Sequence, residues 1–128
     1  MNISQLLTKS ARNFPENLAL AYGPNRMTYA QFNSKVNRLA NALRRLGIGY
    51  GDNVAILQQN YPETLESFFG CFKLGCGAVP INWRLHPKEF AFIIDHSEAK
   101  AVILSPEFNE SVTEIRELIP QAKYFITL

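Results

Sequence analysis

The chain has 128 residues, of which 47% are hydrophobic and 19% charged, and its formal net charge is +2 at pH 7. This length suits one domain and this apolar fraction can close a core, which excludes a disordered chain. A charge so near zero gives no indication of a nucleic-acid or anionic-membrane partner. No leader precedes the first helix, and no apolar run reaches the roughly 18 residues that a membrane span needs. We expect a globular domain of the cytoplasm.

Residues 1–50 predict a short helix, a small hairpin and a longer helix. The short helix ends at Phe14-Pro15, and the hairpin turns at Gly23-Pro24-Asn25-Arg26. In the longer helix, Thr28 and Gln31 have capping-box spacing, and Gly47 stands where a left-handed C-cap would lie. The apolar positions recur at steps of three and four: Ile3, Leu6, Leu7 and Ala11, then Phe32, Val36, Leu39, Leu43 and Leu46. The opposite face of the longer helix, with Lys35, Arg38, Arg44 and Arg45, is predicted to be solvated rather than to bind anions.

Residues 51–128 predict an alternation of strands and helices. The β-branched runs are Val54–Leu57, Ala78–Ile81, Ala101–Leu104 and Tyr124–Leu128. Pro62 begins the first helix between them, with Asn60 and Glu63 as expected cap partners, and Pro87 begins the second. The expected apolar faces are Leu65, Phe68, Phe69 and Phe72, then Phe90, Ile93 and Ile94, and in the third helix Val112, Ile115, Leu118 and Ile119. This alternation predicts an α/β fold, a βαβαβαβ unit with a parallel sheet covered on both faces.

The last predicted strand has no covering helix after it. A parallel strand buried on both faces normally needs one. We therefore expect the sequence to be a truncated part of a larger domain, and its open sheet to allow a homodimer.

Three loops are expected at the carboxyl ends of the strands, where open α/β sheets bind ligands next to the point at which the strand order reverses. They are Gln58-Gln59-Asn60, the segment 82–86, and Ser105-Pro106-Glu107. The middle loop is the richest, because Arg84 can pair with a phosphate and Trp83 can stack on a base. The alternative reading is structural: Trp83 packs, Arg84 is a surface charge, and His86 caps the helix at Pro87.

Other combinations predict no reactive centre. Gly75-Cys76-Gly77 follows a helix and enters a strand, the reverse of a phosphate-binding loop. Cys71, Cys76, His86 and His96 match no zinc spacing, so no metal ligand is predicted. Asp95-His96-Ser97 lies along one helix, and its side chains point in different directions.

A series of segments resembles the opening of the adenylate-forming enzymes, which include acyl-CoA synthetases, firefly luciferases and peptide-synthetase adenylation domains. The segments occur in order through nearly the whole chain: Met27–Asn33, Asn37–Ala40, Leu43–Gly47, Gly51–Ile56, Asn60–Glu63, Lys73–Asn82, Asn82–Leu85, Pro87–Phe90 and Ala99–Ile103. The Asn82–Leu85 segment is more similar to fatty-acyl and aryl CoA ligases than to peptide adenylation domains.

The resemblance implies that the chain is the N-terminal part of an AMP-forming acyl-CoA ligase. Such a parent enzyme uses ATP, Mg²⁺ and CoA: a carboxylate attacks the α-phosphorus of ATP, and the CoA thiol then displaces AMP. The family's phosphate loop and other catalytic motifs have no counterpart in this sequence, so the chain alone is expected to be inactive, to hold none of these cofactors tightly, and to contain no catalytic residue. The resemblance places Asn82, Trp83 and Arg84 on the CoA side.

The resemblance implies that residues 1–128 are the N-terminal portion of the large AMP-binding domain. Residues 1–50 would form a lead-in of helix, hairpin and helix, and residues 51–128 would form a β/α parallel-sheet unit. The expected partner is the rest of the parent ligase. Two alternatives stay open: a stand-alone, flavodoxin-like domain that binds a nucleotide or CoA, and an interaction module that self-associates.

Overall fold

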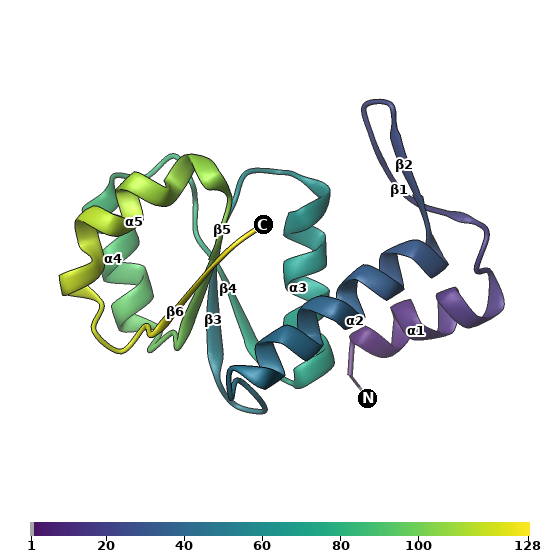
Figure 1. Ribbon diagram of the computed structural model, residues 1–128, viewed down its shortest axis with the longest axis horizontal. Helices are drawn as coiled ribbons and strands as arrows, with labels where there is room; N and C mark the ends of the chain where they lie inside the picture. Colours follow the sequence, from purple (N-terminus) through teal and green to yellow (C-terminus); the bar gives the residue numbers. More distant parts are fainter. Residues whose placement is uncertain (1) are drawn as a thin grey trace.

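A computed structural model describes residues 2–128 of the chain (Figure 1). The helices and strands, in chain order, are α1 (Ser4–Asn13), β1 (Leu18–Tyr22), β2 (Asn25–Thr28), α2 (Tyr29–Arg45), β3 (Asn53–Leu57), α3 (Pro62–Leu74), β4 (Gly77–Pro80), α4 (Pro87–His96), β5 (Ala101–Leu104), α5 (Asn109–Ile115) and β6 (Tyr124–Thr127). Short 3-10 helices at Pro106–Phe108 and Arg116–Leu118 flank α5. The predicted order of elements is confirmed. In the described part of the chain, no helix combines the length and the apolarity that crossing a bilayer requires.

The centre of the molecule is a parallel sheet with the strand order β4-β3-β5-β6. The chain runs from β3 to β4 at one edge, then returns past β3 to β5 and continues to β6. Helices α4 and α5 lie on one face of the sheet, and α2 and α3 lie on the other (Figure 1). Pro80 falls in the edge strand β4, where a residue without an N–H is tolerated. The predicted α/β fold with a parallel sheet is confirmed.

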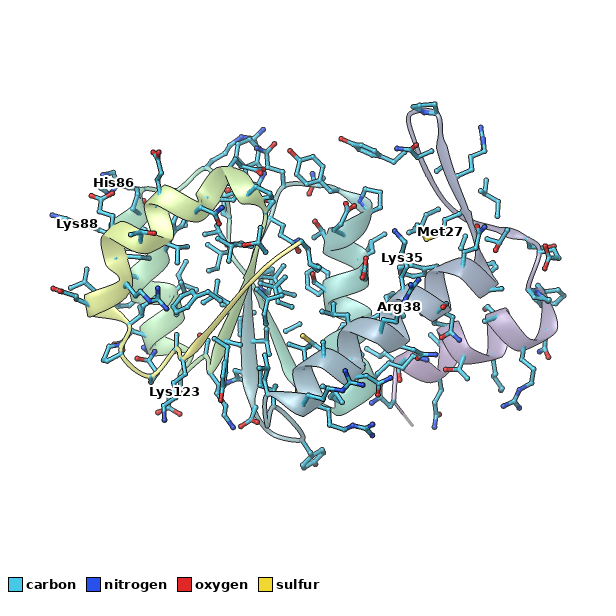
Figure 2. The ribbon with its side chains drawn as sticks, viewed as in Figure 1. Met27, Lys35, Arg38, His86, Lys88 and Lys123 are labelled. Carbon is cyan, nitrogen blue, oxygen red and sulfur yellow. The ribbon has the colours of Figure 1, made fainter. Side chains whose placement is uncertain are left out.

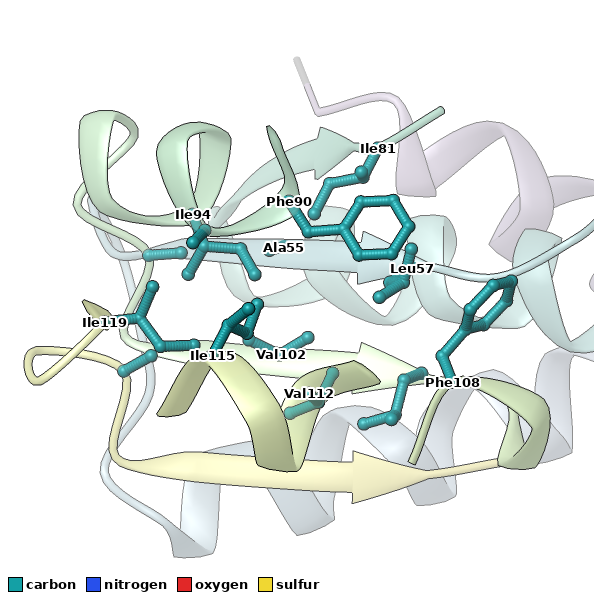
Figure 3. Packing of buried hydrophobic residues seen from close by; sticks show 14 residues of the cluster. Ala55, Leu57, Ile81, Phe90, Ile94, Val102, Phe108, Val112, Ile115 and Ile119 are labelled. Atoms are coloured by element: carbon teal, nitrogen blue, oxygen red, sulfur yellow. The ribbon is translucent and has the colours of Figure 1, made fainter. Parts of the chain in front are cut away.

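Both faces of the central strands β3 and β5 are buried, which explains why these strands show no alternation in the sequence, whereas the edge strands β4 and β6 are half-buried or exposed. Ala55 and Leu57 of β3 pack into the cluster under α4 and α5, whereas Val54 packs into the cluster under α2. Figure 3 shows the first cluster, in which Phe90 of α4 meets Phe108 edge to face with ring centroids 6.1 Å apart. These interlocking contacts fix the sheet whose ends form the site.

The predicted end signals of α2 are present. The backbone N–H of Gln31 donates to Thr28 Oγ1 at 3.2 Å, and the N–H of Thr28 donates to Gln31 Oε1 at 2.9 Å, which completes the capping box. Gly47 follows the helix with φ of +81°, the left-handed conformation that favours glycine. The basic side chains predicted to be solvated are exposed: Lys35, Arg38, Arg44 and Arg45.

The predicted buried face of α3 is wrong. The helix buries its small residues Ser67, Gly70 and Cys71, whereas Leu65 is 41% exposed and the phenylalanines are half-buried. Gly70 is buried where α3 packs closely against Leu39 of α2, since a helix pair in near contact needs a small side chain at the crossing, and Ser67 faces the sheet, where it bonds to Gln58. The predicted cap is also displaced by one residue: Tyr61 is the N-cap, and its N–H donates to Thr64 Oγ1 at 3.4 Å.

Other predicted core positions lie at the surface. Ile3, Leu6 and Leu118 are 56%, 60% and 56% exposed. Ile3 precedes α1, and Leu118 lies in the 3-10 turn after α5, where the tighter winding turns its side chain away from the face predicted with helical spacing. In α4, Ala91 is buried in place of Ile93, which is half-buried.

Candidate functional site

The parallel sheet brings the three predicted loops to the same edge. Residues 58–60 follow β3, residues 82–86 follow β4, and residues 105–107 follow β5. The strand order reverses between β3 and β5, because the connection from β3 leads one way and that from β5 the other. The polar side chains of the loops are therefore grouped at one end of the molecule.

The loop after β4 is shaped by Asn82. Its side-chain oxygen Oδ1 accepts a hydrogen bond from the backbone N–H of Arg84 at 3.1 Å, and its backbone carbonyl accepts from the N–H of Leu85, also at 3.1 Å. Short polar side chains that bond the backbone two residues later stabilise such turns. Asn82 thus sets the turn while its exposed side-chain amide nitrogen remains available to a ligand.

Trp83 and Arg84 form one composite surface. The indole of Trp83 is half-buried against the core cluster beneath α4, and the guanidinium carbon of Arg84 lies 4.4 Å from the centroid of the indole ring. Within residues 2–128 the one salt bridge joins Lys100 to Asp52, so no carboxylate neutralises the exposed Arg84 there. A planar cation supported by an aromatic ring suits a phosphate group and a flat heterocycle.

His86 has a structural role, as the alternative reading of this loop predicted. It is the N-cap of α4, and its Nδ1 accepts from the N–H of Lys88 at 3.2 Å. The backbone N–H of His86 donates to Glu89 Oε2 at 2.8 Å. Figure 2 shows His86 and Lys88 together at the start of α4. The imidazole is therefore committed to holding the helix end.

A cavity of about 350 Å³ joins the loops after β3 and β4. Its polar lining includes Gln58, Asn82 and Arg84. Its apolar lining is Ile56, Phe68, Pro80, Ile81 and Trp83. The cavity therefore lies at the ends of β3 and β4. The reversal of strand order lies next to it, between β3 and β5.

The loop after β5 does not line this cavity. Its Glu107 instead accepts a hydrogen bond from the phenol of Tyr61 at 3.2 Å, which ties the loop to the start of α3. Desolvation and the nearby Glu107 carboxylate raise the pKa of Tyr61. All three predicted loops lie at the same edge of the sheet, but only the loops after β3 and β4 line the cavity.

The sequence places Gln58 in one of the three loops at the strand ends, but it does not predict the burial of its side chain or its bond to Ser67. Gln58 is 4% exposed, and its Oε1 accepts a hydrogen bond from the hydroxyl of Ser67 at 2.8 Å. Its Nε2 has no hydrogen-bond partner. A polar residue directly after a buried strand was the one available signal, because the partner on α3 is recognisable only once the helix is placed.

The other reactive side chains among the described residues form no metal-binding cluster and no reactive thiol site. Among residues 2–128, no three His, Cys, Asp or Glu side chains gather closely enough to hold a metal ion. Cys71 and Cys76 are buried free thiols, and burial raises the pKa of Cys71 to about 12. Partial burial raises the pKa of Glu66 on α3, and the opposing charges of Lys35 and Arg38, both labelled on α2 in Figure 2, limit that rise.

Comparisons with known sequences identify relatives along most of the chain. A family described as AMP-binding enzyme matches residues 7–126. The 4-hydroxybutyrate–CoA ligase 2 of Metallosphaera sedula is 39% identical over 113 residues, which are 88% of this chain and 21% of that protein. The long-chain-fatty-acid–CoA ligase FadD13 of Mycobacterium tuberculosis is 51% identical over 78 residues, or 61% of this chain and 16% of that protein.

Solved structures show the same arrangement of elements. The N-terminal domain of FACL13 from Mycobacterium tuberculosis matches with a TM-score of 0.93 and 37% identity, over 99% of this chain and 34% of that one. The anthranilate CoA ligase AuaEII, solved in complex with anthranoyl-AMP, matches with a TM-score of 0.95 and 30% identity, over 100% of this chain and 25% of that one. The chain thus spans between 16% and 34% of the length of these relatives. The match over residues 7–126 and the shared fold confirm the predicted resemblance to the adenylate-forming enzymes, and the chain belongs to the AMP-binding enzyme family.

Proposed function

We propose that this chain is the N-terminal part of an ATP-dependent acyl-CoA ligase. The reaction would convert a carboxylic or fatty acid, ATP and CoA into acyl-CoA, AMP and pyrophosphate. The observation that carries this proposal is the similarity to the N-terminal domain of FACL13 over 99% of the chain. Residues 1–128 would be the N-terminal portion of the large AMP-binding domain, with a lead-in of residues 1–50 and a β/α unit of residues 51–128.

The proposed role of this chain is to position CoA rather than to catalyse adenylation. In the complete ligase, a carboxylate oxygen would attack the α-phosphorus of ATP and expel pyrophosphate, and the CoA thiol would then attack the acyl carbon and expel AMP. The sequence contains no counterpart of the phosphate loop with which the adenylate-forming enzymes bind ATP. We therefore assign contacts with ATP and Mg²⁺ to the rest of the ligase chain, which would be the main partner.

Asn82, Trp83 and Arg84 are the proposed CoA-side residues. Two features support this assignment: Arg84 is a cation without a carboxylate partner in the described chain, and it stacks 4.4 Å from the Trp83 ring. The guanidinium would bind a phosphate of the CoA nucleotide, the indole would offer a surface to its adenine, and the Asn82 amide would donate to a ligand oxygen.

An ATP–pyrophosphate exchange assay tests whether adenylation requires the rest of the ligase chain. The purified 128-residue chain should catalyse no exchange with any carboxylic acid in a panel of aliphatic and aromatic substrates. The same residues within a chain as long as the relatives should catalyse exchange, and release of AMP should then require CoA. Exchange by the 128-residue chain alone would contradict the proposal.

Self-association is a second candidate function that one observation favours. Among residues 2–128, β6 pairs with β5 on one side and with no strand on the other, and Phe125 and Ile126 remain half-buried. An open strand edge beside apolar side chains can pair with another copy. Light scattering should then show a dimer that dissociates on dilution. A monomer at every concentration would exclude this candidate.

A further inference from the structure

The cavity at the ends of β3 and β4 contains an unsatisfied amide. Gln58 is 4% exposed and lines this cavity, and its Nε2 has no hydrogen-bond partner in the described chain. Burying an unpaired N–H costs free energy, and buried polar side chains in folded proteins are nearly always paired. The Nε2 therefore indicates a group that binds at this point.

Ser67 fixes the direction of the Gln58 side chain. Its hydroxyl lies 2.8 Å from Gln58 Oε1 and 2.9 Å from the backbone carbonyl of Glu63, and Ser67 is fully buried within the contact between α3 and the sheet. Gln58 lines the cavity and Ser67 does not. The amide is thus anchored at Oε1, on the α3 side, and the end that turns away from Ser67 carries the free N–H groups.

The residues that line the cavity indicate which kind of acceptor can bind the Gln58 N–H. Apart from Arg84, the lining is uncharged: the apolar side chains of Ile56, Phe68, Pro80 and Ile81 lie beside the neutral polar ones of Asn60, Thr64 and Asn82. A neutral donor in an uncharged lining suits a neutral carbonyl, because burying a phosphate there would leave its charge uncompensated. The cation of the same cavity, Arg84, is exposed on the loop after β4. The lining therefore suits a ligand with a phosphate at the surface and a neutral, carbonyl-containing arm inside.

We propose that Gln58 donates a hydrogen bond from Nε2 to an amide carbonyl of the pantetheine arm of CoA, and that Ser67 is the residue that positions it. This inference rests on the proposed function, in which Arg84 binds the nucleotide end of the same molecule. It adds a ligand contact directly after β3, in a different loop from Asn82–Arg84. Affinity for the arm and affinity for the nucleotide are then separable.

The test uses the ¹⁵N-labelled 128-residue chain and three probes: CoA, pantetheine, and adenosine 3′,5′-bisphosphate. The side-chain amide signals of Gln58 are identified by their loss in Gln58→Met. CoA and pantetheine should shift these signals, and the bisphosphate should not. Gln58→Met should weaken CoA binding about threefold to tenfold, the contribution of one neutral hydrogen bond. Gln59→Met is the matched control, because Gln59 is the next residue and does not line the cavity, and it should bind CoA normally.

Gln58→Glu tests the direction of the hydrogen bond. This substitution replaces the donor with a charged acceptor at nearly the same size, so CoA binding should weaken more than in Gln58→Met. Tighter binding by Gln58→Glu would show that the ligand supplies a donor, and it would overturn the proposal. If a Gln58 variant does not fold, the response of the amide signals in the unmodified chain decides the question.

The outcomes separate this inference from the proposed function. If CoA shifts the indole N–H signal of Trp83 but leaves the Gln58 amide unmoved, the inference is wrong and the CoA-side loop stands. If pantetheine shifts the Gln58 amide while Arg84→Met does not alter CoA affinity, the inference stands and the loop assignment is wrong. If none of the three probes shifts any signal, both are wrong.

Discussion

Gly70 of α3 lies directly against Leu39 of α2, since a β-carbon added at Gly70 would stand 3.0 Å from Leu39 Cδ2. Ser67 and Cys71, the other buried residues of α3, are also small. The close approach allows α3 to reach the sheet at a depth where Ser67 meets Gln58. The packing of two helices thus determines the polar geometry at the strand ends.

Gly70→Val should destabilise the fold by about 1–3 kcal/mol, the usual cost of overpacking a well-packed contact. Urea unfolding followed by circular dichroism measures the loss. Leu65→Val is the matched control on the same helix, and it should have a smaller effect because Leu65 is 41% exposed. The double variant Gly70→Val with Leu39→Ala should be less destabilised than the sum of the two single variants, because the two substitutions share one contact. Full stability of Gly70→Val alone would contradict this view of the helix pair.

Asp52 should stabilise the fold in a pH-dependent manner. Its carboxylate accepts the N–H of Gly49 at 2.9 Å and lies 3.4 Å from the Lys100 ammonium. The bond from Gly49 and the charge of Lys100 outweigh partial desolvation, so the pKa of Asp52 falls below its ordinary value of 3.8. Because the folded-state pKa is the lower one, this stabilisation is complete above pH 3.8 and is lost as the pH falls through the folded-state pKa.

Asp52→Asn should therefore reduce the free energy of unfolding at pH 7 by about 1 kcal/mol, the scale of a partly exposed charged hydrogen bond. The difference from the unmodified chain should vanish only as the pH falls through the folded-state pKa of Asp52, which lies below 3.8. Urea titrations at several pH values provide the measurement. Asp95→Asn, at an exposed position of α4, should change stability little. A difference that persists at low pH would show that Asp52 acts through packing instead.

Both thiols should resist modification in the folded chain. Burial and the neighbouring Cys76 raise the pKa of Cys71 to about 12, and the thiolate is the reactive form. Burial also raises the pKa of Cys76, whose Sγ lies 3.1 Å from the carbonyl oxygen of Gly49 as a weak donor. A disulfide reagent at pH 8 should label neither residue without denaturant and both in urea. Labelling faster than global unfolding would indicate local opening of α3.

The sequence predicted the elements that local signals define. Pro62 and Pro87 begin helices, Gly75 ends one with φ of +72°, and the capping box of Thr28 begins another. The buried face of α3 could not be predicted in this way, because the helix is apolar on several sides and periodicity cannot rank them. Contact with α2 at Gly70 and with the sheet at Ser67 determines which side of α3 is buried, and these contacts exist only in the tertiary structure.

The same distinction holds for the site. Parallel strands bring their carboxyl ends to one edge, so the loop at Asn82, Trp83 and Arg84 was predictable from the strand pattern. The stacking of Arg84 on Trp83 and the turn made by Asn82 were not, because they depend on side-chain conformation. The role of Gln58 depends on Ser67, a residue of the next helix, and on a cavity whose walls come from three elements.

Fluorescence of Trp83 during a titration with CoA tests the proposed ligand site most directly, because Trp83 is the one tryptophan of the chain. We expect a saturable change in its emission, and an affinity about tenfold or more weaker in Arg84→Met, the scale of a lost charge-assisted hydrogen bond. Lys88→Met removes an exposed neighbouring cation and should bind CoA normally. Unchanged emission at millimolar CoA, or equal affinities of the unmodified chain and Arg84→Met, would contradict the assignment of this loop to CoA.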